Sequence, residues 1–338
     1  MPTTSDSALD DAIRAAIDGK TKPPGALGRI EDVAARIARL QGRVTPRMSR
    51  CRLVLFAADH GLAQEGVSAY PPEVTRQMVL NFAAGGAAAN VFARAGGLDL
   101  AVVNAGVLGG PLAAPGVIDR PMGAGTANCR HGPAMSPETC AAALQAGREI
   151  AAEGTWDALA LGEMGIANTS AATLIAHRLT GLPIADLVGR GTGLDDAGLA
   201  HKHEVLGAAS ARVPGEIGPA AALAEFGGFE IAMMTGAMLA AAEARRMVLV
   251  DGFIASVAAL VAVRMAPDAR AALVFAHHSA EAGHGAVLAA LQAQPLLHLG
   301  LRLGEGTGAA LAWPLVRAAA AMLNEMASFA DAGVSGGA

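Results

Sequence analysis

Short apolar runs, each about as long as a buried β-strand, recur along the chain and end at polar or glycine residues. The six runs of this kind lie at 52–59, 98–106, 156–163, 246–252, 271–279 and 295–305. Runs that are apolar throughout are typical of strands covered on both faces, as in a parallel sheet. The pattern therefore predicts a parallel six-stranded sheet.

Alanine-rich segments with helical spacing separate these runs. The predicted helices lie at 73–95, 137–152, 168–180, 230–245, 253–265, 280–293 and 309–328. Strands that alternate with helices in this way form a sheet with helices on both faces. The fold class that we predict is α/β.

Two further helices, at 9–20 and 27–42, are predicted before the first strand. Like the helix after the last strand, they have no strand partner, so we expect the three to pack together. We therefore predict two domains. A small helical subdomain is formed by both chain ends, 1–48 and 309–338, and an α/β domain, 49–308, carries the active site.

Polar or glycine residues stand where most of the predicted strands end. Five of these junctions are 59–61, 162–165, 251–252, 277–279 and 304–306. Ligands of open α/β sheets bind at the carboxyl ends of the strands, so we expect these loops to share one site. Taken singly, each junction is equally well explained by a strand that emerges into water.

Composition and charge narrow the kind of partner. The chain has 338 residues, of which 53% are hydrophobic, enough for a large core. Its net charge is −5, its arginines are scattered, and its only lysines are Lys20, Lys22 and Lys202. No basic stripe for nucleic acid or anionic lipid is present. We therefore expect small-molecule substrates and neither a nucleic-acid nor a membrane partner.

The cysteines, histidines and N-terminus favour a cytoplasmic protein without a metal. The three cysteines, Cys51, Cys129 and Cys140, lack the number and spacing of a disulfide framework or a zinc site. His60, His277, His278 and His284 lack paired ligand spacing as well. The first residues are polar and acidic, unlike a signal peptide. We expect a cytoplasmic location and no metal.

Glycines alternate in the loop that precedes the last helix. Gly304, Gly306 and Gly308 resemble a phosphate-binding loop, yet Glu305 stands among them. Backbone N–H groups at a helix start attract anions, whereas a carboxylate there repels a phosphate. Glu305 is therefore either a functional carboxylate or an ordinary helix-capping or charge-paired residue.

Five segments resemble the signature sequences of the nicotinate-nucleotide:dimethylbenzimidazole phosphoribosyltransferase family. They are KPPGALGRIEDVA (22–34), AADHGLAQEGVSAYPPEVTRQMVLNFAAGGAAANVFAR (57–94), GEMGIANTSAA (162–172), EFGGFEIAMMTGAML (225–239) and LGEGTGAALAWPLVRAAAAMLNEMASF (303–329). The resemblance implies a Rossmann-like large domain, a small helical domain and a homodimer. It implies transfer of the 5-phosphoribosyl group of nicotinate mononucleotide to 5,6-dimethylbenzimidazole, with inversion at C1′, in assembly of the cobalamin lower ligand. The products are α-ribazole 5′-phosphate and nicotinate, and no cofactor is implied.

The resemblance also implies roles for individual residues. Glu305 corresponds to the catalytic base, which takes the proton from one imidazole nitrogen while the other attacks C1′. Glu163 is a second catalytic carboxylate that holds the ribose or stabilises an oxocarbenium-like transition state. The phosphoribosyl-binding positions that the resemblance implies are Gly191, Lys202, Asp251 and Ser279, and we expect Gly165, Asn168 and Thr169 to bind the same group. The positions expected around the aromatic base are Tyr70, Gln77, Met78 and Leu303.

Some of these residues have a simpler interpretation from the sequence alone. Lys202 follows a flexible loop with Gly189, Gly191 and Gly193, a weak phosphate-binding pattern, and is otherwise interpreted as a solvated helix lysine. Asn168 and Thr169 are expected to cap the helix that begins there. Tyr70, the only tyrosine, offers a ring for stacking or is simply a core or surface residue.

Two departures from the family pattern affect the predicted specificity. Ala167 and Ala26 stand where the family commonly has glycine and serine. Both changes are small and leave the carboxylates in place. The alternatives that remain are transfer to adenine or a phenolic base, a ribosyl hydrolase, and a nucleotide-binding sensor without catalysis.

Overall fold

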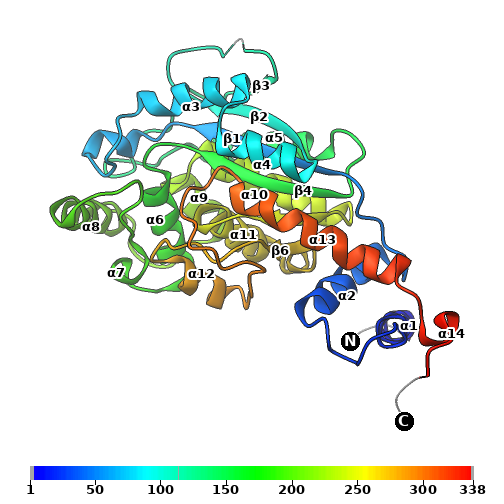
Figure 1. Ribbon diagram of the computed structural model, residues 1–338. Coiled ribbons are helices and arrows are strands. Elements are labelled where there is room, and N and C mark those ends of the chain that lie inside the picture. The colour runs from blue at the N-terminus through cyan, green and yellow to red at the C-terminus, as the bar shows by residue number, and fades with distance from the viewer. Residues whose placement is uncertain (1–3, 113, 336–338) are drawn as a thin grey trace.

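Six parallel strands form one sheet between two layers of helices in the computed structural model, which describes residues 4–112 and 114–335 (Figure 1). The strands are β1 (Cys51–Ala58), β2 (Asp99–Gly106), β3 (Val117–Asp119), β4 (Ala158–Met164), β5 (Met247–Val250) and β6 (Leu273–Phe275). Their order is β3-β2-β1-β4-β5-β6. The order reverses between β1 and β4, where open α/β sheets bind ligands. The predicted α/β class with a Rossmann-like, parallel six-stranded sheet is confirmed.

The helices connect and flank these strands. They are α1 (Thr4–Asp18), α2 (Arg29–Gln41), η1 (Gly61–Glu65), α3 (Glu73–Ala84), α4 (Ala88–Gly96), α5 (Pro137–Ala152), α6 (Asn168–Thr180), α7 (Ile184–Leu187), α8 (Asp196–Ala211), α9 (Pro219–Phe226), α10 (Phe229–Glu243), α11 (Phe253–Met265), η2 (Pro267–Ala272), α12 (His284–Ala290), α13 (Thr307–Glu325) and α14 (Phe329–Ala332). None of these described helices combines the length and apolar character needed to cross a membrane.

Side chains of β1 alternate between two cores. Leu53 and Leu55 are buried with residues of α2, α4 and α13 on one face of the sheet. Val54 and Phe56 are buried with residues of α5, α10 and α11 on the other face. A strand that is covered on both faces needs apolar residues at successive positions, which explains the unbroken apolar run in the sequence.

One predicted strand is wrong. The segment 295–305 forms a single parallel bridge, between Leu297 and His277, and continues as a loop. Gly300 and Gly304 have φ values of 68° and 82°, which an extended strand does not accommodate. The sixth strand is instead the three-residue β3 at the opposite edge.

Two helix predictions also need correction, and two longer helices are not predicted. The segment 73–95 forms two helices, because Gly85 adopts a left-handed conformation with φ 81° and ends α3. The helix predicted at 280–293 is shorter, since α12 begins only at His284. Helices α8 and α9 are absent from the prediction. The apolar residues of α8 form no clear stripe along one face, so the sequence carries little periodic signal there.

The two ends of the chain meet at one end of the molecule (Figure 1). Helices α1 and α2 pack there beside the C-terminal part of α13. Lys20 donates a hydrogen bond through Nζ to the carbonyl oxygen of Met326 at 2.6 Å. The division into domains at 48/49 and 308/309 stays a prediction, and its outermost residues, 1–3 and 336–338, lie outside the described residues.

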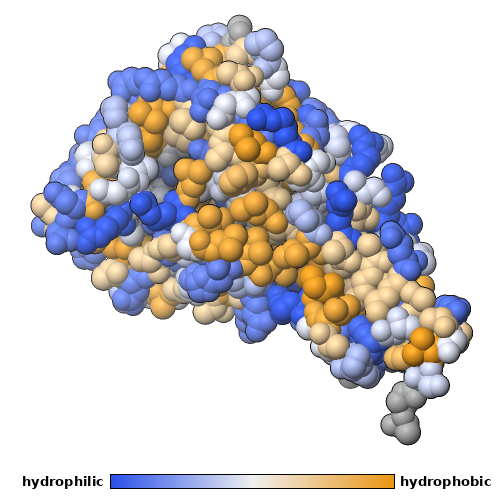
Figure 2. All heavy atoms as spheres, in the orientation of Figure 1, coloured by the Kyte–Doolittle hydropathy of each residue, from blue (hydrophilic) through white to orange (hydrophobic). Residues whose placement is uncertain are grey.

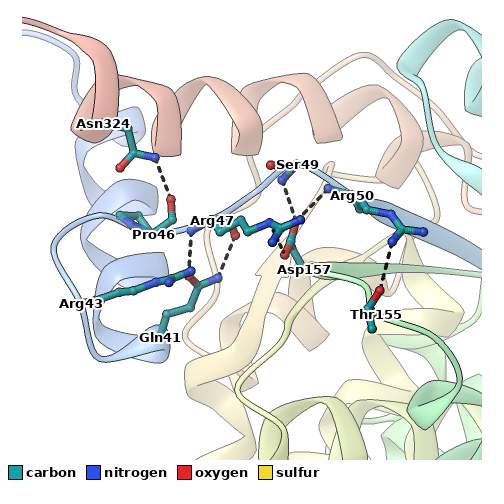
Figure 3. A network of polar contacts seen from close by, with 9 residues as sticks. All are labelled: Gln41, Arg43, Pro46, Arg47, Ser49, Arg50, Thr155, Asp157 and Asn324. Atoms are coloured by element: carbon teal, nitrogen blue, oxygen red, sulfur yellow. Dashed lines mark hydrogen bonds and ion pairs between the residues drawn. The ribbon is translucent and has the colours of Figure 1, made fainter.

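The segment between α2 and β1 is held by polar contacts, shown in Figure 3. The Asp157 carboxylate accepts hydrogen bonds from the backbone N–H groups of Ser49, at 2.8 Å, and Arg50, at 2.9 Å. Asn324 of α13 donates to the carbonyl oxygen of Pro46 at 2.8 Å. The segment is therefore tied both to the start of β4 and to α13.

Candidate active site

A narrow cleft lies at the carboxyl ends of β4 and β5, beside the point where the strand order reverses. Its volume is about 100 Å³. The predicted site residues that line it are Glu163, Gly165, Asn168, Thr169, Gly191, Ser279 and Leu303. The loops that follow β4, β5 and β6, and the loop before α13, all contribute to its walls. Loops that are far apart in the sequence thus meet at one place.

Glu163, near the end of β4, has its carboxyl group buried in the wall of the cleft. The side-chain amide of Asn168 donates a hydrogen bond to its Oε2, and its Oε1 lies directly against Gly304. Burial, together with the charges of Asp251 and Glu230, raises the pKa of Glu163 to about 8. At neutral pH this carboxyl group is therefore protonated and able to donate a hydrogen bond.

Glu305 follows Gly304 in the loop that leads into α13 and, unlike Gly304, is not among the described residues that line the cleft. Its backbone is left-handed, with φ 62°, a conformation that glutamate rarely adopts. Its side chain is buried, and Oε2 has no hydrogen-bond partner among the described residues. Burial raises the pKa of Glu305, although the backbone N–H of Ala89 opposes the rise. Local strain and an unpartnered buried acceptor are both features of functional sites.

The carboxylate of Asp251, which follows β5, is hydrogen-bonded to the start of α13. Its Oδ1 accepts a hydrogen bond from the backbone N–H of Ala309 at 2.9 Å and lies 3.6 Å from Nε2 of His277. Burial raises the pKa of Asp251 to about 7, and backbone N–H groups of the Gly306–Ala309 turn limit the rise. Asp251 is not among the described residues that line the cleft.

Lys202 of α8 is fully buried, contrary to the solvated lysine that is the simpler interpretation of the sequence. Its Nζ donates hydrogen bonds to Oγ1 of Thr169 at 2.9 Å and to the carbonyl oxygen of Gly189 at 3.2 Å. Burial lowers the pKa of Lys202 to about 8, and the charge of Glu281 opposes this effect. The ammonium group thus lies directly behind the cleft wall formed by Thr169 and Gly191.

Ser279 is positioned by a buried histidine. Its backbone N–H donates to Nδ1 of His284 at 2.8 Å, and Nε2 of His284 lies 2.9 Å from Oγ of Ser256. Burial and the neighbouring histidines lower the pKa of His284 to about 3. The ring is therefore neutral, and the hydrogen bonds place its proton on Nε2.

The expected helix cap at Asn168 or Thr169 is wrong. The residue before α6 is Ala167, with φ 76°, and it provides no side-chain cap. Asn168 instead donates to Glu163, and Thr169 accepts from Lys202. Asn168 therefore connects the cleft to the buried carboxyl group of Glu163, and Thr169 connects it to the buried ammonium group of Lys202.

The residues expected around the aromatic base are more dispersed. Tyr70 is exposed, and Met78 packs on the core beside α13. Gln77 lines a separate depression between α3 and the loop after β2. The loop before Tyr70 reaches the cleft rim, where Oγ of Ser68 lies 3.4 Å from Oγ1 of Thr192. Of the four residues predicted to surround the aromatic base, only Leu303 is among the described residues that line the cleft.

Four polar residues that line the cleft have no predicted role in the site: Thr192, His277, Glu281 and Arg302, of which only His277 belongs to a strand-end junction expected there. Arg302 donates through Nη1 to the carbonyl oxygen of Gly191 at 3.5 Å. Glu281 faces the same loop, and burial raises its pKa while Lys202 and Arg302 oppose the rise. Glu281, Arg302 and Thr192 each stand within two positions of a predicted site residue, a proximity that could have identified them.

The histidines near the strand ends make separate contacts. Nε2 of His60 lies 2.7 Å from Oε1 of Glu230, both groups being buried. His277 packs closely against Gly308, and His284 is bound to Ser256. Within residues 4–112 and 114–335, no three His, Cys, Asp or Glu side chains are grouped so as to hold a metal ion.

Comparison with known proteins gives concordant matches over nearly the whole chain. A family model described as phosphoribosyltransferase matches residues 3–334. The nicotinate-nucleotide–dimethylbenzimidazole phosphoribosyltransferase of Cupriavidus taiwanensis is 56% identical over 333 residues, covering 98% of this chain and 96% of that protein. The protein of the same name from Ralstonia nicotianae is 58% identical over 335 residues, covering 98% and 95%.

A solved structure matches equally broadly. The crystal structure of CobT from Thermus thermophilus superposes with a TM-score of 0.94 at 49% sequence identity. The match covers 98% of this chain and 100% of that one. The similarity therefore extends over both the α/β sheet and the terminal helices.

Proposed function

The chain belongs to the nicotinate-nucleotide–dimethylbenzimidazole phosphoribosyltransferase family, and from this we propose what its cleft does. The protein is a transferase that moves the 5-phosphoribosyl group of nicotinate mononucleotide to 5,6-dimethylbenzimidazole. The products are α-ribazole 5′-phosphate and nicotinate, as in assembly of the cobalamin lower ligand. The observation that carries the proposal is a pair of buried carboxyl groups beside the glycine loop: that of Glu163, which lies against Gly304, and that of Glu305, the residue after Gly304.

Glu305 acts as the general base in this proposal. One imidazole nitrogen of the incoming base attacks C1′ of the ribose, and the proton on the other nitrogen becomes acidic. The unpartnered Oε2 of Glu305 accepts that proton. The Glu305 side chain is buried, and burial raises its pKa. A carboxylate with a raised pKa binds a proton more strongly, which suits a general base.

Glu163 has the complementary role. With a pKa of about 8 it carries a proton at neutral pH, so it is suited to donate a hydrogen bond to a ribose oxygen. The leaving nicotinate needs no acid, since its ring nitrogen is cationic in the nucleotide and becomes neutral when the bond to C1′ breaks. Catalysis then depends on aligning the two rings on opposite sides of C1′.

The phosphate binds at the other end of the cleft. Gly191, Thr169 and Ser279 provide backbone and hydroxyl groups there, and Arg302 adds a cation at the mouth. Lys202 contributes charge from behind Thr169. The cleft of about 100 Å³ is smaller than typical ligand pockets, so the flanking glycine loops move when substrates bind.

The protein acts as a homodimer in the cytoplasm. Apolar surface gathers over α13 and the segment before it, on the face shown in Figure 2. Leu299 and Leu303 are 57% and 58% exposed, and Leu303 belongs to the cleft. Large exposed apolar side chains beside a site support burial by a second copy of the chain.

A nicotinate-release assay tests the proposed reaction. Nicotinate mononucleotide is incubated with the protein in the presence and absence of 5,6-dimethylbenzimidazole. The transferase releases nicotinate only when the base is present. Release without the base would identify a hydrolase, and nucleotide binding without release would identify a sensor. Parallel reactions with adenine and a phenol determine whether the site prefers another acceptor.

A further inference from the structure

A second cavity, distinct from the candidate active site, lies between α2 and the edge of the α/β sheet. Its volume is about 660 Å³, within the range of small-molecule sites. It is bounded by α2 on one side and by η2, β6 and the end of α12 on the other, and it shares no lining residue with the active-site cleft. We call it the arginine cleft, after the four arginines that line it: Arg29, Arg36, Arg39 and Arg270.

Two of these arginines have a carboxylate partner. Arg29 pairs with Asp32 of the same helix at 3.3 Å, and Arg39 pairs with Asp10 of α1 at 2.5 Å. Both pairs are largely exposed to solvent. Asp32 is the only acidic residue that lines the arginine cleft among the described residues. Positive charge therefore predominates in this cavity.

The other two arginines, Arg36 and Arg270, occur in no ion pair among the described residues. Their guanidinium groups donate to one and the same acceptor, the carbonyl oxygen of Leu273, at 2.5 Å and 3.3 Å. Two half-buried cations are thus held side by side, and neither forms an ion pair among the described residues, although the charge of Asp32 acts on Arg36. Burial and the neighbouring arginines lower the pKa of both groups, that of Arg270 to about 10.

Hydrogen-bond capacity remains on Arg36. Only its Nη1 has a hydrogen-bond partner among the described residues, so Nε and Nη2 are free to bind a ligand. Arg270 uses its three nitrogens for the carbonyl oxygens of Leu273, Leu291 and Gln292, which fixes its guanidinium group in place. A rigid cation next to a cation with free donors is the arrangement that recognises oxyanions.

We propose that the arginine cleft binds a phosphate-bearing small molecule, with the phosphate group between Arg36 and Arg270. A phosphate oxyanion supplies the ion-pair partner that neither guanidinium group has among the described residues, and it accepts hydrogen bonds from the free N–H groups of Arg36. Arg36 belongs to α2 and Arg270 to η2. The ligand therefore joins the N-terminal helices to the α/β sheet and stabilises their association.

Calorimetric titration at low ionic strength tests this site in the Lys202→Ala background, which weakens the phosphate site of the active-site cleft. The probes are inorganic phosphate and glycerol 3-phosphate, which separate a free anion from a phosphomonoester. We expect saturable binding of one or both with Kd below about 1 mM. Arg36→Gln and Arg270→Gln should each weaken it at least tenfold, whereas Arg264→Gln, at an exposed arginine outside the cleft, should leave it unchanged.

Two further measurements keep the result decisive. Each variant is checked for its melting temperature, because the arginines also join α2 to the sheet. If a variant does not fold, tungstate soaked into crystals of the unmodified protein locates the anion by anomalous scattering, and density between Arg36 and Arg270 supports the site. Absence of saturable binding, equal binding by the Arg36→Gln variant, or no tungstate in the arginine cleft overturns the proposal and leaves the arginines as structural contacts.

Discussion

The carboxylate of Asp251 accepts a hydrogen bond at 2.9 Å from the backbone N–H of Ala309 in the first turn of α13. The contact joins the end of β5 to the glycine loop in which Glu305 lies. Because Glu305 holds a strained backbone conformation, with φ 62°, its position depends on such external contacts. Asp251 is therefore expected to position the proposed base.

Replacing Asp251 by alanine should leave backbone N–H groups at the start of α13 without an acceptor. We expect a loss of about 1–3 kcal/mol in the free energy of unfolding and a lower kcat. The measurements are thermal unfolding and steady-state kinetics, with Asp268→Ala, at an exposed position in η2, as the control. A higher KM for the nucleotide with an unchanged melting temperature would instead show that Asp251 binds the ribose, as the family resemblance implies.

Replacing Lys202 by alanine should weaken nucleotide binding. Removing a charge-assisted contact to phosphate costs about 1.5–3 kcal/mol, equivalent to a rise in KM of roughly 10- to 150-fold. The change should appear in KM for nicotinate mononucleotide, with KM for the base unaffected. Arg190→Ala is a suitable control, because Arg190 is an exposed cation in the same loop. An unchanged KM would move the phosphate site away from Lys202.

The two carboxyl groups should give a bell-shaped dependence of kcat on pH. Activity should fall at acid pH as Glu305 becomes protonated. The midpoint of this fall should lie above 4.5, the pKa of an ordinary glutamate, because burial raises the pKa of Glu305. It should also fall as pH rises through about 8, where Glu163 loses the proton that it donates. Lys202 titrates near the same pH, so kcat is measured at saturating nucleotide. Glu163→Gln cannot ionise and should lack the alkaline fall; persistence of that fall would assign it to another group.

Replacing Ala167 by glycine should stabilise the protein. Ala167 has φ 76°, and a left-handed conformation costs alanine about 1–2 kcal/mol, part of which is offset by the greater entropy of glycine in the unfolded chain. We expect a net gain of about 0.5–1 kcal/mol in thermal or denaturant unfolding. Ala171→Gly, in the interior of α6, should lower stability instead. A loss of stability in Ala167→Gly would mean that the methyl group packs favourably, outweighing the strain.

The sequence predicts best those features that depend on local pattern. The bounds predicted for α5, α6 and α11 match the structure, because their apolar residues and flanking polar residues form uninterrupted signals. The carboxyl ends of the strands locate Glu163 in the same way. The sequence does not predict features that depend on contacts between residues far apart in the chain. The three-residue β3 is defined by pairing with β2, and the burial of Lys202 depends on contacts with Thr169 and Gly189 that α8 does not encode by itself.

Replacing Glu305 by glutamine tests the proposed base directly. Glutamine keeps the shape and the ability to hydrogen-bond to a ring N–H but cannot accept the proton, so kcat should fall by about 10²–10⁴ while the melting temperature and the binding of dimethylbenzimidazole change little. The control is Glu325→Gln, at the exposed far end of the same helix. If Glu305 served only as a structural residue, the outcome would be reversed: stability would fall by about 1 kcal/mol and turnover would stay nearly normal. Because Oε2 of Glu305 has no partner among the described residues, the structural contribution that glutamine could disturb is small. Turnover within threefold of the unmodified protein, with the base saturating, would therefore exclude Glu305 as the general base and shift the assignment to Glu163, which lines the cleft and can take the proton at a pH above its pKa of about 8.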